Sequence, residues 1–142
     1  MTITTGFFSG VKKPHQHDIV SIAAGQPRWL QVLHKHSALA PRYVLLNDFR
    51  NNVISESQYV TFFNAMLDKL NPAEVIEQLT TMSPSAIMCC HCNTTHFCHR
   101  HLVAEWLESN LDIEIHEHNV GRVTRSAGRI ITEPVPVQQT MF

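Results

Sequence analysis

The sequence lacks a run of about eighteen apolar residues, and its first segment, MTITTGFFSGVKKP, lacks the pattern of a signal peptide. The first absence predicts a chain without a membrane-spanning helix, and the second favours a cytoplasmic protein. The sequence also lacks an excess of charge of either sign, since its net charge is -1, which argues against bulk electrostatic binding of a nucleic-acid backbone. There are no internal repeats, so a repeat architecture is not expected.

What is present fits one α/β domain. A chain of 142 residues with 44% hydrophobic and 16% charged residues has the size and composition of a single globular domain. Apolar runs and alternating patterns predict strands in 2–7, 18–25, 86–90 and 112–118, with Ile113 and Ile115 inward and the acidic residues outward. Helical spacing predicts helices in 42–50, 55–70, 71–82 and 98–108, the second opening with a capping box at Ser55 and Gln58. This order indicates a three-layer domain with a mostly parallel sheet and helices on both faces.

The domain is predicted to span residues 1–118. A C-terminal extension, residues 119–142, follows it. The extension contains GRVTRSAGRIIT, which suggests a hairpin or an added edge element, and the proline-rich EPVPVQQTMF, which we expect to be partly mobile.

All four cysteines of the chain lie in one stretch, AIMCCHCNTTHFCHRHLVAEWLE. Cysteines clustered beside histidines in a chain without a secretory signal point to metal binding, catalysis or a buried thiol, rather than to a disulfide framework. Cys89 alternates away from Cys90 along the predicted strand, so it is most simply a small buried residue.

Cys98, His99 and Arg100 are the candidate catalytic residues. They lie where a predicted buried strand leads into a helix, the place where α/β folds bind ligands. The helix N-terminus would stabilise a Cys98 thiolate and favour an anionic ligand, and Arg100 would grip a phosphate or carboxylate. His99 leans toward the buried face, as a general acid or base or as a core histidine, whereas His101 is expected to be solvated.

The same residues resemble the bacterial and phage family called domain of unknown function 488. The resemblance rests on MCCHCNTTHFCHRHLVAEWLE, with Cys90 ending the strand and Cys98, His99 and Arg100 forming the signature, and it extends over residues 2–115. It implies a three-layer α/β fold but no established reaction. The family usually has an acidic residue in place of Cys92 and often an arginine in place of Ala24.

A zinc site is the alternative interpretation of the cysteine cluster. Cys90, Cys92, Cys98 and His101 have suitable ligand types, and residues two apart at a strand end face the same way. All four, however, fall within one short stretch, whereas structural zinc usually joins two separated segments. We therefore expect no cofactor, with zinc as the alternative.

The remaining candidates are weaker. Arg28 and Trp29 follow the second predicted strand, so with Cys90 they are candidate ligand-binding residues, although a turn with a core tryptophan explains them equally well. Solvated surfaces explain three histidine pairs better than metal sites do: His15 and His17, His34 and His36, His116 and His118. The basic residues of the extension suggest a partner or nucleic-acid contact, although a solvated hairpin is the simpler interpretation: Arg122, Arg125 and Arg129.

The sequence thus predicts a strand-end pocket for an anionic small molecule, preferably a nucleotide or another phosphate-bearing compound, with Cys98 as a nucleophile. The alternative is a non-enzymatic binding protein that sequesters a ligand or blocks a host protein, such as one encoded by a phage.

Overall fold

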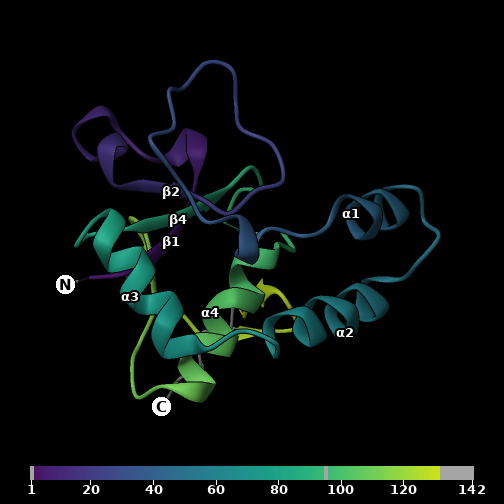
Figure 1. Ribbon diagram of the computed structural model, residues 1–142. Coiled ribbons are helices and arrows are strands. Elements are labelled where there is room, and N and C mark those ends of the chain that lie inside the picture. Colours follow the sequence, from purple (N-terminus) through teal and green to yellow (C-terminus); the bar gives the residue numbers. More distant parts are fainter. Residues whose placement is uncertain (1, 95, 132–142) are drawn as a thin grey trace, which may run out of the picture.

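A computed structural model describes residues 2–94 and 96–131 of the chain. Its centre is a five-stranded sheet in the order β3-β2-β4-β1-β5 (Figure 1). Every pair of neighbouring strands is parallel. The strands are β1 (Thr4–Phe7), β2 (Ile19–Ser21), β3 (His34–Lys35), β4 (Ile87–Cys90) and β5 (His116–Glu117). The predicted α/β class with a mostly parallel sheet is confirmed.

The neighbouring interior strands β2 and β4 lie in segments that are rich in apolar residues. All residues of β2 and β4 are buried, as expected for parallel strands covered on both faces. Both were predicted from their apolar runs. β3 was not predicted, because it is an edge strand of two polar residues in a segment that shows no alternation.

The α-helices of the described residues are α1 (Tyr43–Arg50), α2 (Glu56–Leu67), α3 (Pro72–Met82) and α4 (His99–Asn110). The predicted capping box at Ser55 and Gln58 is present at the start of α2, and the side chain of Asn71 caps α3. The buried positions of α2 are Tyr59, Phe63 and Leu67, whereas Phe62 is 52% exposed.

The two faces of the sheet have different covers. On one face, α2, α3 and α4 enclose the larger core, to which Val20 and Met88 contribute. On the other, two 3-10 helices, η1 (Phe8–Gly10) and η2 (Lys13–Asp18), lie beside a smaller cluster that contains Phe8, Cys90 and Cys98. α1 lies beside α2 and away from the sheet (Figure 1), and none of its residues is buried.

A β-hairpin follows the sheet. β6 (Arg125–Ser126) pairs antiparallel with β7 (Arg129–Ile130), as the sequence suggested, and it packs against α4. The backbone N–H of Cys98 donates to the Gly128 carbonyl at 2.9 Å, so the hairpin holds the beginning of α4. The proline-rich segment predicted to be mobile lies outside the described residues. In the described part of the chain, no helix is both long and apolar enough to span a membrane.

Candidate functional site

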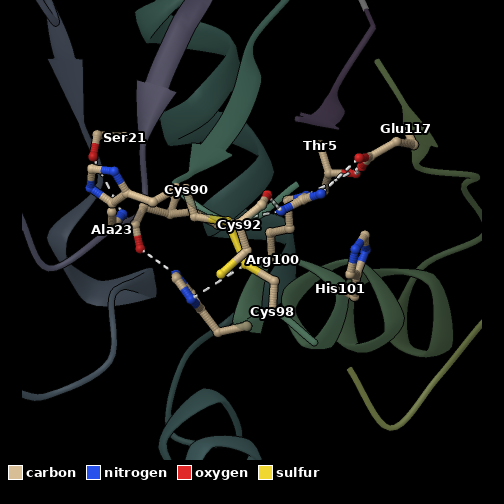
Figure 2. Close-up of a disulfide and its surroundings, with 12 residues drawn as sticks. Thr5, Ser21, Ala23, Cys90, Cys92, Cys98, Arg100, His101 and Glu117 are labelled. Atoms are coloured by element: carbon tan, nitrogen blue, oxygen red, sulfur yellow. Dashed lines mark hydrogen bonds and ion pairs between the residues drawn. A yellow bond between two sulfur atoms is a disulfide. The ribbon is translucent and has the colours of Figure 1, made fainter. Parts of the chain in front are cut away.

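The candidate site lies where β4 ends and α4 begins. Cys90 is the last residue of β4, and Cys98 is the N-cap of α4, with an extended backbone and no capping bond from its side chain. A disulfide joins the two sulfurs (Figure 2). Cys90 is 2% exposed and Cys98 3% exposed, so the pair is enclosed by the protein. The fold therefore brings together two of the four cysteines that the sequence singled out.

The His99 ring lies between the backbone carbonyl of Ile22 and the sulfur of Cys98. Its Nε2 lies 2.6 Å from the carbonyl oxygen of Ile22, just beyond β2, and its Nδ1 lies 3.9 Å from Cys98 Sγ. Because a carbonyl only accepts hydrogen bonds, Nε2 carries the ring hydrogen and Nδ1 presents its lone pair to the sulfur. Burial lowers the pKa of His99 to about 4, so the ring is neutral near pH 7. This arrangement suits a base that accepts a proton from a thiol.

Arg100 makes all its contacts with protein groups. Its side chain is fully buried, and its Nη1 donates to Cys90 Sγ at 3.0 Å and to the Cys92 carbonyl oxygen at 2.6 Å. Its Nε and Nη2 donate to the two carboxylate oxygens of Glu117 at 3.3 and 2.9 Å. The predicted grip of Arg100 on an external phosphate stays a prediction. In the structure Arg100 places a positive charge against the sulfur of Cys90.

Glu117 belongs to a buried polar network (Figure 2). One of its oxygens accepts from the Thr5 hydroxyl at 2.6 Å, and that hydroxyl in turn accepts from Nη2 of Arg125 at 2.6 Å. Nε of Arg125 donates to Nδ1 of His101 at 3.0 Å. The network connects β1, β5, α4 and the hairpin.

Two expectations are corrected here. His101 was expected to be solvated but is fully buried, because its ring packs against Arg125 in the interior. Burial, with further contributions from the charges of Arg100 and Arg125, lowers the pKa of His101 to about 2. The acidic residues of the last strand were expected to face outward, yet Glu117 is 1% exposed because two buried arginines accompany it.

Sequence reasoning missed Glu117 and Thr5, although a signal for the first was present. Strict alternation places Ile113, Ile115 and Glu117 on one face of an extended segment. Since the two isoleucines were expected to face inward, the same alternation would have placed Glu117 inward, contrary to the stated expectation. Thr5 carried no such signal, because a threonine in a strand is ordinarily a β-branched packing residue.

The other predicted residues are more dispersed. Cys89 is fully buried, as predicted, and burial raises its pKa to about 12. Arg28 and Trp29 are exposed in the loop after β2, and this loop is tied to the loop after β4 by a 2.8 Å hydrogen bond between His91 Nε2 and the Gly25 carbonyl. Of the basic residues of the extension, Arg125 is buried, whereas Arg122 and Arg129 form surface ion pairs with Glu114 and Glu56.

The metal donors that the structure assembles differ from the predicted set. Within the described residues, the group suited to a metal ion consists of Cys90, Cys98 and His99, whose donor atoms all lie within 4.8 Å of one another. Cys92 and His101, which completed the predicted zinc set, are not in this group. Cys92 is half-buried, and His101 bonds to Arg125.

Comparison with known families adds one finding. The family model DUF488-N3a, described as the active DUF488-N3 subclade, matches residues 18–111, which is more than half of the chain. The matched region runs from the end of η2 to just beyond α4 and contains Cys90, Cys98, His99 and Arg100. Neither the curated proteins nor the solved structures gave a match.

Proposed function

Because the chain belongs to the DUF488 family, we propose that it is a cytoplasmic enzyme in which the reduced Cys98 is the nucleophile and His99 its base. The substrate class is an anionic small molecule, with a nucleotide or another phosphate-bearing compound as the first choice. The description of the matched subclade as active supports a catalytic role.

The observation that carries the proposal is the position of the His99 ring. One nitrogen bonds the Ile22 carbonyl, and the other faces Cys98 Sγ. A nucleophile, a base and a group that orients the base are the recurring parts of nucleophilic catalysis. Once Cys98 ionises, its negative charge favours protonation of His99, so the reduced site can exist as a thiolate beside an imidazolium. The positive end of the α4 dipole stabilises the same thiolate.

The choice of an anionic ligand rests on the position of the site in the fold. It lies beyond the carboxyl end of a parallel strand, at a helix N-terminus, which is a favourable environment for phosphate. The loop after β2 presents Arg28 and Trp29 to solvent, and the hydrogen bond between His91 and Gly25 ties this loop to the site. Arg28 offers an exposed cation, and Trp29 offers an exposed ring on which a base can stack.

The test of the nucleophile is alkylation of the reduced, metal-free protein with iodoacetamide at pH 7, mapped by mass spectrometry. We expect Cys98 to be labelled before Cys89, Cys90 and Cys92. Faster labelling of Cys92, the most exposed of the four, would contradict the proposal. The ligand is tested by a thermal-shift screen of nucleotides and phosphate-bearing metabolites, with Arg28→Ala as the variant that should weaken a stabilising compound.

A second candidate function is a non-enzymatic binding protein that holds zinc. It is favoured by the three donor atoms of Cys90, Cys98 and His99, and by the bond from His99 Nε2 to the Ile22 carbonyl, since metal-binding histidines usually donate their other nitrogen in this way. In that case the reduced protein should contain about one zinc per chain, Cys90 and Cys98 should resist alkylation, and chelation should lower the melting temperature.

A further inference from the structure

We propose that Cys90 and Cys98 form a reversible dithiol–disulfide couple with unequal roles, in which Cys98 reacts with a peroxide and Cys90 resolves the oxidised product. The inference rests on the proposed function in one respect, namely that Cys98 is the reactive thiol. It adds an oxidation site, a second functional cysteine and a chemical class of co-substrate.

The position of the disulfide does not suggest that the fold needs it for stability. It links the end of the central strand β4 to the N-cap of α4, and the segment between these positions is short. The sheet and α4 already share a core built from several elements. Disulfides in cytoplasmic proteins are typically transient and catalytic or redox-sensing, which favours a couple that opens and closes.

The two sulfurs have different neighbours, and these neighbours assign the roles. Cys98 Sγ faces the lone pair of His99 Nδ1 at 3.9 Å, and Cys98 occupies the N-cap position of α4. Cys90 Sγ receives a hydrogen bond from Nη1 of Arg100 at 3.0 Å. A hydrogen bond from a guanidinium is stronger to a thiolate than to a neutral thiol, so this contact favours the anionic form of Cys90.

The charge balance of the buried network supports an anion at Cys90. The side chains of Arg100, Arg125 and Glu117 are all fully buried, so the network contains two cations and one anion. Glu105 and Glu108 lie on the Arg125 side of α4 and offset part of that charge. On the Arg100 side, the described side chain that can become negative within hydrogen-bond reach, apart from Glu117 itself, is Cys90.

The other two cysteines lack these features. Cys89 is fully buried, and desolvation raises its pKa to about 12. Cys92 is half-buried, and its carbonyl, not its sulfur, bonds Arg100. Because Cys90 and Cys98 are both nearly inaccessible, hydrogen peroxide is a better-suited oxidant than the bulky disulfide of another protein.

The chemistry balances in three steps. The Cys98 thiolate attacks one oxygen of hydrogen peroxide, an S–O bond forms, the O–O bond breaks, and the leaving hydroxide takes up a proton to give water. The Cys90 thiolate then attacks the sulfur of the Cys98 sulfenic acid; the S–S bond forms, the S–O bond breaks, and hydroxide again leaves as water. A dithiol reduces the disulfide by two exchange steps and is itself oxidised to its disulfide.

The experiment treats the reduced full-length protein with one equivalent of hydrogen peroxide and blocks the remaining thiols with N-ethylmaleimide in denaturant. We expect peptide mapping to show a Cys90–Cys98 disulfide, with Cys89 and Cys92 still labelled, and dithiothreitol to restore all four thiols. In Cys90→Ser, the Cys98 sulfenic acid should persist and be trapped by dimedone. In Cys98→Ser, peroxide should leave Cys90 as a thiol. Cys92→Ser is the matched control and should behave as the unmodified chain.

Two results would overturn the inference. The first is that peroxide forms no disulfide between Cys90 and Cys98 in the unmodified chain. The second is that Cys98 forms a disulfide with Cys92 as readily as with Cys90. Mapping of the unmodified chain needs no variant, so the test stands even if Cys90→Ser folds poorly. Iodoacetamide labelling of the same reduced sample separates the two proposals. Selective labelling of Cys98 without a peroxide-induced disulfide defeats only the redox couple, whereas failure to label Cys98 selectively defeats the proposed nucleophile as well.

Discussion

Arg100 and Glu117 form a two-bond ion pair, in which both side chains are fully buried, between the first turn of α4 and β5. The pair fixes the guanidinium plane so that Nη1 reaches Cys90 Sγ. Two parallel N–H to carboxylate bonds hold a guanidinium in one orientation, which a lysine in the same place would not achieve. The geometry of the cysteine site therefore depends on a residue from the last strand of the sheet.

Glu117→Gln is expected to destabilise the protein strongly. The substitution leaves Arg100 and Arg125 as buried cations without their carboxylate, which typically costs about 3–5 kcal/mol. Glu114→Gln is the matched control, because Glu114 is half-exposed and pairs with Arg122 at the surface, where an ion pair contributes about 0–1 kcal/mol. Urea denaturation at pH 7 measures both. Similar small losses for the two variants would show that the buried pair does not support the fold.

Stability should fall as the pH drops from about 6.5 to 5. The pKa values of His99 and His101 are lowered to about 4 and about 2, chiefly by burial. Below about pH 6.5 the unfolded chain therefore binds protons at these histidines that the folded chain does not bind. Each contributes a loss of up to about 1.4 kcal/mol per pH unit in this window.

The measurement is the free energy of unfolding at a series of pH values between 7 and 5, for the unmodified chain and for His101→Gln. The variant lacks one of the two buried rings, so its stability should depend less steeply on pH. An unchanged slope would mean that His101 binds protons equally in the folded and unfolded states.

Much of the fold was predictable because its signals are local. β2 and β4 are apolar runs, the start of α2 is a capping box, and Asn71 precedes a proline at the start of α3. β3 was not predictable, because a strand of two polar residues at a sheet edge has no periodic hydrophobic pattern.

The site was only partly predictable, since its decisive contacts join distant parts of the chain. The motif itself marked Cys98, His99 and Arg100, but the group that orients His99 is a backbone carbonyl at Ile22, which no sequence pattern can show. The burial of His101 depends on Arg125, which lies in a hairpin beyond the predicted domain boundary. From sequence alone, a histidine or an arginine is expected at the surface, because the buried partner that would satisfy it is not known.

His99→Gln should slow the alkylation of Cys98 in the reduced protein by about tenfold or more at pH 7. Glutamine can still donate to the Ile22 carbonyl, but it offers no basic nitrogen to the thiol. His91→Gln is the control, because His91 is an exposed histidine in the neighbouring loop, bonded to the Gly25 carbonyl. Equal alkylation rates in the two variants, followed by mass spectrometry over time, would remove His99 from the role of base.

The last prediction compares Gly128→Ala with Gly121→Ala. Both glycines have positive φ values, 84° and 100°, so an alanine at either position is strained by about 1–2 kcal/mol. At Gly121 a Cβ atom would meet nothing within 4 Å, whereas at Gly128 it would clash with the ring of Phe97. Gly128→Ala should therefore cost about 1–3 kcal/mol more than Gly121→Ala in urea denaturation.

The comparison also tests whether the hairpin holds the cysteine site. Phe97 directly precedes Cys98, and the Gly128 carbonyl accepts the hydrogen bond from the Cys98 N–H. A displaced hairpin would loosen the N-cap of α4 and expose Cys98, so Gly128→Ala should also raise its alkylation rate in the reduced protein, while Gly121→Ala should not. If Gly128→Ala lowers stability but leaves that rate unchanged, the hairpin stabilises the fold without controlling access to the thiol.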